Sequence, residues 1–407
     1  MPADDRTPRF LREAFQRHYK SPRLRAPDRL RKREFAFMPF AGGIMQRHLG
    51  FVNLNELRTH LVNRVPAHAY YSSAYYERPG APTMDEKGWQ GADLVFDLDA
   101  DHLPGAKGMT FEAMLAEVKR LFVRLVDEFL LGELGFQEAS LLTVFSGGRG
   151  YHAHVRDPRV LSLGSHERRE LVDYITGKDL DLELYVSEPP IYAVEFKGRR
   201  QVRRTVKLPR QDEPGWRGRF TRAFEAWLDS LAGMPREDAI KEVTEVAGVT
   251  PRAAASLFKR VFEDPDLPLE VVKQKLREGI VEFFPTETKL GAAALRRIQE
   301  QRGIPLAKAE TDEPVTSDIK RLIRLPTSIH GKTGLEVVAM SRAELDAFDP
   351  LRDAVPAVYG DAAVRVSLEK PLEIRLRDET FNLSPGLTEV PEYAAVFLAA
   401  RGVARLP

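Results

Sequence analysis

The chain has 407 residues, of which 43% are hydrophobic, so it is long enough to form two or three compact units with packed cores. It carries 61 basic and 60 acidic residues and no cysteine, which excludes disulfides, thiolate zinc sites and cysteine-bound iron–sulfur clusters within the chain. No apolar run approaches the roughly 20 residues that cross a bilayer, and the N-terminus lacks a signal-peptide core. We therefore expect a soluble, cytoplasmic protein with no membrane contact.

The basic residues are unevenly placed along the chain. Eleven arginines and lysines fall within the first 33 residues, and seven more fall between Lys197 and Arg210. A nearly neutral protein can still bind polyanions at such local tracts. The tract at Lys197–Arg210 is therefore either a nucleic-acid contact or a solvated charged face.

The first segments predict a helix followed by strands. Helical spacing within residues 1–33 is shown by Phe10, Leu11, Phe15 and Tyr19. From Arg33 to Phe51, alternating aromatic residues predict a strand, Gly42-Gly43 a turn, and the residues from Ile44 onward a second strand. Two polar residues of this hairpin, Glu34 and Arg47, are either functional groups or ordinary surface charges.

The stretch from Leu94 to Asp101, LVFDLDAD, has the alternation of a half-buried strand, with its leucines and phenylalanine on one face and its aspartates on the other. Side chains two apart on a strand lie roughly 7 Å from each other. Carboxylates held in this way repel one another unless a cation lies between them, and Mg²⁺ prefers oxygen ligands. We interpret Asp97 and Asp99 as a metal-binding pair; the alternative is a strand end with a solvated acidic face.

The next segments predict a helix and a strand of the same sheet. Thr110 is a suitable N-cap for an amphipathic helix whose apolar stripe extends to Phe129. A strand over Ser140–Phe145 follows. Strand–helix–strand order indicates that this strand and the aspartate-bearing strand share one sheet, with the helix packed on it.

The loop Ser146–Gly150, with the sequence SGGRG, leads directly into a further strand. Glycines let backbone N–H groups approach a phosphate closely, and arginine supplies a planar charged fork. His152 and His154 share one face of the strand that follows. The loop is therefore either a phosphate-binding loop or a tight hairpin turn.

The second half of the chain predicts an all-α lobe inserted between mixed segments. Residues 211–300 carry helical spacing and an N-cap signal at Thr250-Pro251. After this lobe, Asp318 opens a short segment that contains Arg321 and Arg324. Two strands are then expected, at Thr327–His330 and Leu335–Val338, joined by the turn at residues 331–334. The predicted fold class is α/β (α+β mixed), with one domain formed by residues 1–210 and 301–407 and the helical lobe by residues 211–300.

Three motifs stand in order along the chain: FDLDAD, SGGRGYH, and an aspartate followed by RLIRLPTSIHGKTGL. Together they strongly resemble the catalytic (small) subunit of archaeal and eukaryotic DNA primase. The resemblance extends from about Arg33 to the C-terminus. It implies a primase-polymerase catalytic domain built around a mixed sheet, with an inserted helical lobe.

The resemblance also implies roles for individual residues. Two divalent ions, Mg²⁺ or Mn²⁺, would be held by Asp97, Asp99 and Asp318. Contacts to the incoming nucleotide would come from Ser146, Arg149, His152, Arg324 and His330. Arg47 matches an arginine that reaches the phosphates, Glu34 an acid near the metals, and Lys332 a motif position whose role stays open. These residue types suit nucleotidyl transfer, which requires positioned metals and cations more than covalent help.

The implied function is synthesis of short primers on single-stranded DNA from NTPs or dNTPs, in a heterodimer with a large primase subunit. The alternatives are a related primase-like polymerase of DNA end repair, a DxD glycosyltransferase, and a non-catalytic single-strand binder. Many members of the family carry a zinc knuckle built mainly from cysteines, which this chain lacks, so we predict no structural zinc. Asp101 and His102 are either extra ligands or the end of the strand.

Overall fold

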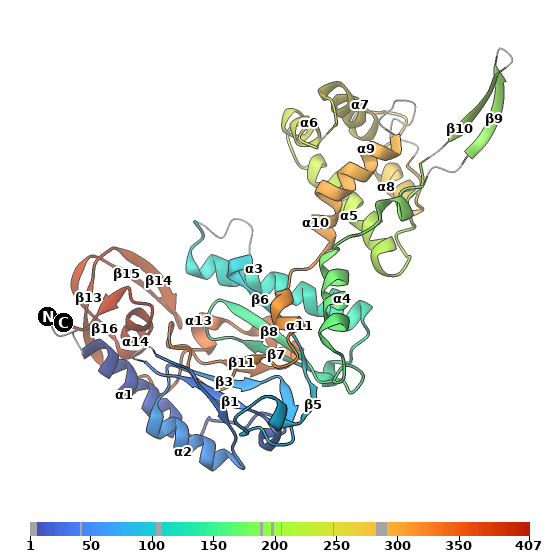
Figure 1. Ribbon diagram of the computed structural model, residues 1–407. Helices are drawn as coiled ribbons and strands as arrows, with labels where there is room; N and C mark the ends of the chain where they lie inside the picture. The colour runs from blue at the N-terminus through green and yellow to red at the C-terminus, as the bar shows by residue number, and fades with distance from the viewer. Residues whose placement is uncertain are drawn as a thin grey trace. The chain divides into compact units, whose positions relative to one another are not determined.

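The computed structural model describes residues 6–40, 43–102, 108–187, 190–196, 199–204, 206–246, 248–281 and 291–407 (Figure 1). The chain divides into two compact units. The first combines Met1–Val172 with Glu310–Pro407, and the second is Asp173–Ala309. The helical segment expected at residues 211–300 lies inside the second unit, which begins earlier and also includes a β-hairpin.

The first unit contains a four-stranded sheet near the N-terminal helices. Every neighbouring pair in this sheet is antiparallel, in the order β11-β3-β1-β2. Its strands are β1 (Phe35–Met38), β2 (Gln46–Leu49), β3 (His68–Ser72) and β11 (Leu322–Arg324). The predicted pair of strands within Arg33–Phe51 is therefore confirmed, although Gly42 of its turn lies outside the described residues. The segment after Asp318 is a strand of the same sheet, which its short sequence did not predict.

Two N-terminal helices pack against each other, and the first also contacts α14 (Glu392–Ala400) (Figure 1). α1 (Arg6–Lys20) buries one stripe at helical spacing, formed by Leu11, Ala14, Phe15, His18 and Tyr19. α2 (Leu54–Arg64) begins at Asn53, whose side chain accepts the N–H of Glu56, so this residue caps the helix.

A second four-stranded sheet, in the order β12-β7-β8-β6, carries the aspartates. Its strands are β6 (Leu94–Asp99), β7 (Leu141–Phe145), β8 (Gly150–Val155) and β12 (Val338–Met340). β8 lies between β6 and β7 and is antiparallel to both, which confirms that the two predicted strands share a sheet. The register places Asp97 opposite His152 and Asp99 opposite Gly150.

One face of this sheet is covered by α3 (Phe111–Arg124), which continues as a π-helix over Leu125–Glu133. Thr110 caps α3 as predicted, and Phe122 stacks on Tyr151 of β8. Because side chains alternate along a strand, His152 points to the opposite face from Tyr151. The acids and histidines therefore lie on the face that α3 leaves uncovered.

A buried arginine joins the beginnings of the two sheets. Arg33, just before β1, donates to the carbonyls of Ser72 and Ser73 at 2.8 and 2.9 Å. Its other terminal nitrogen lies 2.8 Å from Asp93, just before β6, and both side chains are fully buried. A buried charge is tolerated only when it is paired in this way, so the pair fixes the two strand starts relative to each other.

The segment between β11 and β12 differs from expectation. In place of two strands at Thr327–His330 and Leu335–Val338, the structure has one isolated bridge between Ile329 and Glu336. On either side of this bridge the segments exchange backbone hydrogen bonds, in which His330 donates to Leu335, Val337 to Ser328 and Thr327 to Val337. The turn between them closes where Thr333 and Gly334 donate to the carbonyl of His330. The expected pairing and its turn are therefore present, but they form one bridge and not two regular strands, and β12 begins only at Val338.

The rest of the first unit consists of short elements around these sheets. The C-terminal sheet has the order β16-β13-β17, and β14 pairs with β15. The bounds of these elements are β4 (Ala74–Tyr76), β5 (Trp89–Ala92), α11 (Glu313–Ser317), α12 (Arg342–Ala347), α13 (Pro350–Asp353), β13 (Ala363–Leu368), β14 (Leu372–Leu376), β15 (Glu379–Leu383), β16 (Gly386–Pro391) and β17 (Ala404–Arg405).

The second unit has its own hydrophobic core, centred on α5. Its helices are α5 (Gly215–Ala232), α6 (Arg236–Thr244), α7 (Pro251–Phe262), α8 (Leu269–Arg277), α9 (Gly291–Ile298) and α10 (Ile304–Ala307), while α4 (Ser165–Thr176) crosses the division. Thr250 caps α7 as predicted. A hairpin is formed by β9 (Pro190–Phe196) and β10 (Arg199–Arg204), and β10 contains part of the basic tract. Lys197, Gly198 and Thr205 of that tract lie outside the described residues, so its nucleic-acid role stays a prediction.

None of the helices in the described part of the chain combines the length and the apolar character that a bilayer span requires.

Candidate active site

A cavity of about 640 Å³ lies in the first unit, on the face of the second sheet that α3 leaves uncovered. Both sheets contribute to its walls, together with the glycine loop after β7 and the turn after β11. Its lining includes Tyr70, Asp97, Asp99, Phe111, Ser146, Gly148, Arg149, His152, Arg321, Arg324, His330, Lys332, Thr333 and Arg401. Seven of the expected site residues thus meet here, from three segments far apart in the chain.

The acid pair sits at the end of β6. Burial, followed by the nearby carboxylates of Asp99 and Asp312, raises the pKa of Asp97 to about 7, although Arg321 and Arg324 act to lower it. The Nε2 atom of His152 lies 3.3 Å from Oδ1 of Asp97. Burial lowers the pKa of His152 to about 3, so this imidazole is neutral and does not compensate the carboxylate. The pair therefore has no counter-charge in the facing histidine and fits a cation.

The glycine loop forms the wall beside the acids. Ser146 accepts the N–H groups of Gly148 and Gly150 at 3.2 and 3.3 Å, which holds the loop closed. A Cβ atom on Gly150 would lie 2.6 Å from the carbonyl oxygen of Leu98, so only glycine allows β8 to approach β6 this closely. Arg149 extends over the acids, with Nη2 2.7 Å from Asp101 and 3.5 Å from Asp99.

The opposite wall comes from β3, β11 and the turn after β11. The guanidinium of Arg324 lies 4.7 Å from the ring centre of Tyr70, and its Nη2 atom is 3.1 Å from Nε2 of His330. Burial and the charge of Arg324 hold the pKa of His330 well below its usual range, so this histidine is neutral as well. Thr333 donates to the carbonyl of Gly147, which ties this turn to the glycine loop.

Two of the expected residues, Asp318 and Arg47, are not among the described residues that line the cavity. Oδ1 of Asp318 accepts the N–H of Lys320 at 2.8 Å. Nε of Arg47 lies 3.2 Å from Glu34, whose other oxygen is 2.7 Å from the buried Lys87. The charges of Glu34, Arg47 and Asp318 all act on the hydroxyl of Tyr76. Glu34 therefore pairs with Arg47 and Lys87, and none of these three lines the cavity.

A different acid, Asp312, lies beside the pair. Its backbone N–H donates to the carbonyl of Asp97 at 2.8 Å, and Thr311 donates to the same carbonyl at 3.2 Å. Its carboxylate raises the pKa of Asp97, after burial and the charge of Asp99. Sequence reasoning missed Asp312, although an aspartate shortly before a proline that opens a helix, as in TDEPV, is a recognisable N-terminal signal.

Within the described ranges, no three acidic, histidine or cysteine side chains are grouped closely enough to hold a metal ion. Asp97 and Asp99 nevertheless provide the oxygen donors that Mg²⁺ or Mn²⁺ prefer. Burial and the charge of Asp99 raise the pKa of Asp97, and a bound cation would offset both effects. The donor set therefore fits a divalent ion.

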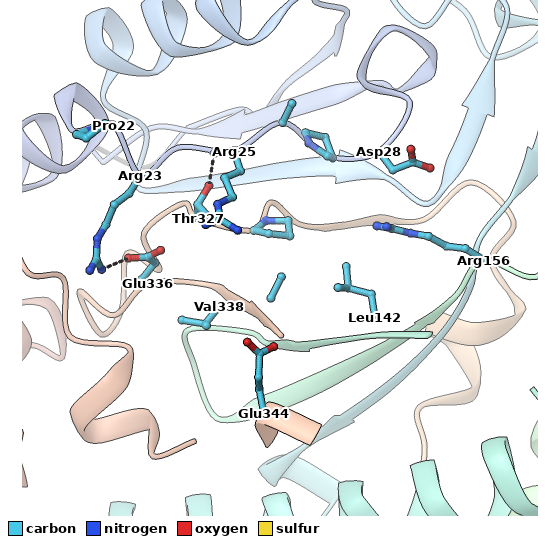
Figure 2. A pocket seen from close by; sticks show the side chains of 14 residues that line it. Pro22, Arg23, Arg25, Asp28, Leu142, Arg156, Thr327, Glu336, Val338 and Glu344 are labelled. Atoms are coloured by element: carbon cyan, nitrogen blue, oxygen red, sulfur yellow. Dashed lines mark hydrogen bonds and ion pairs between the residues drawn. The ribbon is translucent and has the colours of Figure 1, made fainter. Parts of the chain in front are cut away.

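Figure 2 shows a second cavity of the first unit, of about 610 Å³, between the loop at Pro22–Asp28 and the second sheet. Three guanidinium groups, of Arg23, Arg25 and Arg156, face three carboxylates there, so its charges balance. In the cavity with the acid pair, five cationic side chains face only two carboxylates, and its histidines are neutral. A polyanionic ligand carrying divalent cations is therefore better matched to the cavity with the acid pair.

Comparison with known proteins agrees with this geometry. The family described as DNA primase small subunit matches residues 96–343. Relatives named DNA primase small subunit PriS come from Methanothrix thermoacetophila, Methanocella arvoryzae and Halobacterium salinarum, and each is 41% identical to this chain. The first alignment covers 99% of this chain and 100% of the relative, the second 98% and 99%, and the third 98% of each. The similarity therefore extends through both units.

Proposed function

The chain belongs to the DNA primase small-subunit family, and from this premise we propose that it synthesises short primers on single-stranded DNA by nucleotidyl transfer from nucleoside triphosphates. The observation that supports this most is the cavity in which Asp97 and Asp99 face a set of cationic and neutral polar side chains from the glycine loop and the turn after β11. A triphosphate with its cations would satisfy both sets at once.

In this proposal Asp97 and Asp99 hold divalent ions, and the third acid is Asp312 in place of Asp318. Asp312 is preferred because its charge acts on Asp97 and its backbone is hydrogen-bonded to β6, whereas the carboxylate of Asp318 accepts the backbone N–H of Lys320. When bound, Mg²⁺ or Mn²⁺ supplies positive charge that stabilises the developing charge on the reacting oxygens.

The residues of the chain bind and orient the triphosphate. Arg149 and Arg324 donate charge-assisted hydrogen bonds to phosphate oxygens, and Lys332 adds a point charge. His152 and His330 are neutral, so they add no repulsion among the cations. Nε2 of His330 accepts a hydrogen bond from Arg324, and His152 lies 3.3 Å from Asp97, so the two histidines position the arginine and the acid. Ser146 acts by holding the loop closed. Arg47 is left out because it pairs with Glu34 outside the cavity lining.

The proposal includes a partner. The relatives are named small subunits, and we infer that this chain likewise pairs with a larger primase subunit in a heterodimer. The single-stranded template and the nucleotides would meet at the acid pair.

The test is primer synthesis by the purified protein on a single-stranded template with NTPs or dNTPs and Mg²⁺ or Mn²⁺. We expect short products from the wild type and a loss of at least about 100-fold in the Asp97→Asn, Asp99→Asn double variant, because both metal-binding carboxylates are removed. Glu373→Gln, an exposed acid on β14, is the matched control and should leave synthesis unchanged. Wild-type rates from the double variant would overturn the proposal.

A further inference from the structure

The rim of the acid-pair cavity includes a residue that belongs to none of the three motifs. Arg401 follows α14 at the C-terminal end of the chain and lines the cavity together with Arg149 of the glycine loop. Its guanidinium lies 4.0 Å from the ring centre of Phe111, the first residue of α3, and 5.3 Å from that of Phe397. Phe111 also lines the cavity.

The two aromatic rings orient this guanidinium. A guanidinium stacked on an aromatic face keeps its N–H groups in the plane of the stack, where they point sideways. Phe111 and Phe397 contact each other, with ring centres 5.9 Å apart, so they form one support. The edge of Arg401 that the rings leave uncovered is available for hydrogen bonding in the cavity.

In the part of the chain that the structure describes, Arg149 is paired with carboxylates, but Arg401 is not. Arg149 has the carboxylates of Asp101 and Asp99 at 2.7 and 3.5 Å. No carboxylate among the described residues forms an ion pair with Arg401, and burial together with the charge of Arg149 lowers its pKa. Two like charges that face one cavity repel each other, and an anion bound between them would relieve this repulsion and supply the partner that Arg401 lacks among the described residues.

We propose that Arg401 binds a phosphate of the incoming nucleoside triphosphate, together with Arg149, and that Phe111 and Phe397 set the orientation of its guanidinium. The proposal rests on the function proposed above and adds a binding residue that the motifs do not contain. A planar fork held edge-on is the geometry that matches phosphate oxygens. The C-terminal helix thereby becomes part of the nucleotide site.

The test is equilibrium binding of a non-hydrolysable ATP analogue to the full chain in the presence of Mg²⁺, alongside the apparent KM for nucleotide and for template. We expect Arg401→Ala to weaken analogue binding by about 10- to 100-fold, the effect of losing one charge-assisted hydrogen-bonded group, and to raise the nucleotide KM while the template KM stays the same. Arg401→Lys keeps the charge but loses the fork and should fall in between.

Arg377→Ala is the matched control. The guanidinium of Arg377 lies 4.1 Å from the ring centre of Tyr393, a residue of the same helix as Phe397, but it does not line the cavity. Phe111→Leu keeps an apolar side chain and should weaken binding less than Arg401→Ala. If Arg401→Ala lowers the melting temperature strongly, analogue binding by Arg401→Lys is compared with that of wild type instead, because this variant is expected to keep the fold.

The outcomes separate the two proposals. If the wild type makes primers and binds the analogue, but Arg401→Ala and Arg401→Lys bind it as tightly as wild type, the role of Arg401 is refuted and the primase function stands. An equal loss in Arg401→Ala and Arg377→Ala would also refute it, because it would show a general structural effect. A wild type that makes no primers and binds no analogue would overturn both.

Discussion

Asp97 illustrates how one residue can be poorly placed for folding and well placed for binding. It is partly buried beside Asp99 and Asp312, and its strand partner His152 is neutral. In the absence of a cation, this arrangement costs free energy, because a desolvated carboxylate is repelled by its neighbours. Such a site is stable only because the surrounding sheet fixes it.

Two aspartates six positions apart give a direct test at the residue scale. We expect Asp312→Asn to reduce primer synthesis by at least about 100-fold, because it removes a carboxylate next to the acid pair. Asp318→Asn should change the rate by less than about threefold, since its carboxylate accepts the backbone N–H of Lys320 and does not line the cavity. Steady-state rates of both variants decide this, and the reverse order would restore Asp318 as the third acid.

Glu336, in the second cavity, gives a prediction for stability against pH. Burial raises its pKa to about 7, although Arg23 and Arg25 oppose the rise and Arg23 lies 3.7 Å away. The folded protein therefore binds this proton more tightly than the unfolded chain does. The resulting stability is complete below about pH 4.5 and is lost as the pH rises to about 7.

The Glu336→Gln variant lacks this titration. We expect it to match wild type near pH 4 and to exceed it at pH 8 by about 1–3 kcal/mol in the free energy of unfolding. Denaturant titrations at the two pH values measure this difference. Glu369→Gln, an exposed carboxylate, is the control and should show no such gain. A pH-independent difference for Glu336→Gln would contradict the assignment.

At the scale of elements, the cavity depends on two loops that support each other. The glycine loop after β7 and the turn after β11 are joined by the hydrogen bond from Thr333 to Gly147. Gly147 has a φ of +73°, and a Cβ atom there would lie 2.8 Å from Cβ of His330. The position therefore requires glycine for two reasons: its positive φ angle, and the lack of space for a Cβ atom beside His330.

Gly147→Ala tests this contact. Gly402 has a φ of +70° and open space where a Cβ atom would lie, so Gly402→Ala is a matched control that adds the same backbone strain without a clash. We expect Gly402→Ala to lower stability by about 1–2 kcal/mol and to leave primer synthesis unchanged. Gly147→Ala should cost more stability and slow synthesis by about tenfold or more, because it displaces His330. Equal effects of the two variants would show that the loop contact is unimportant.

At the scale of the whole molecule, the chain forms two units with separate cores. The core of the second unit is built from its own helices, with Leu228 of α5 fully buried within it. The acid-pair cavity is lined entirely by residues of the first unit. Stability of the second unit and nucleotide binding are therefore expected to be separable.

Leu228→Ala tests this separation. We expect it to destabilise the second unit by about 2–5 kcal/mol, because it leaves a cavity in a packed core. Hydrogen exchange should accelerate within residues 173–309, while affinity for the ATP analogue stays that of wild type. A loss of analogue affinity comparable to that of Arg401→Ala would show that the two units act as one.

Several features of the fold follow from local sequence. The caps at Thr110 and Thr250 and the strands β1, β2 and β6 were predictable, because caps and alternation depend on neighbours in sequence. The strand β11 was not predictable, because three residues are too few to show the alternation of a strand. The hairpin expected around Gly331–Gly334 is present, with backbone hydrogen bonds from His330 to Leu335 and from Val337 to Ser328, but it forms one bridge and not two regular strands.

The sequence by itself determined the family and the motif residues, because an aspartate pair on a strand and a glycine loop before a strand are set within a few residues of each other. Only the tertiary structure decided which distant groups join them. Asp312 and Asp318 look alike in sequence, and Arg401 has no motif at all. Their positions depend on how β6, α11 and α14 pack, and packing is fixed by contacts between segments that the chain separates by hundreds of residues.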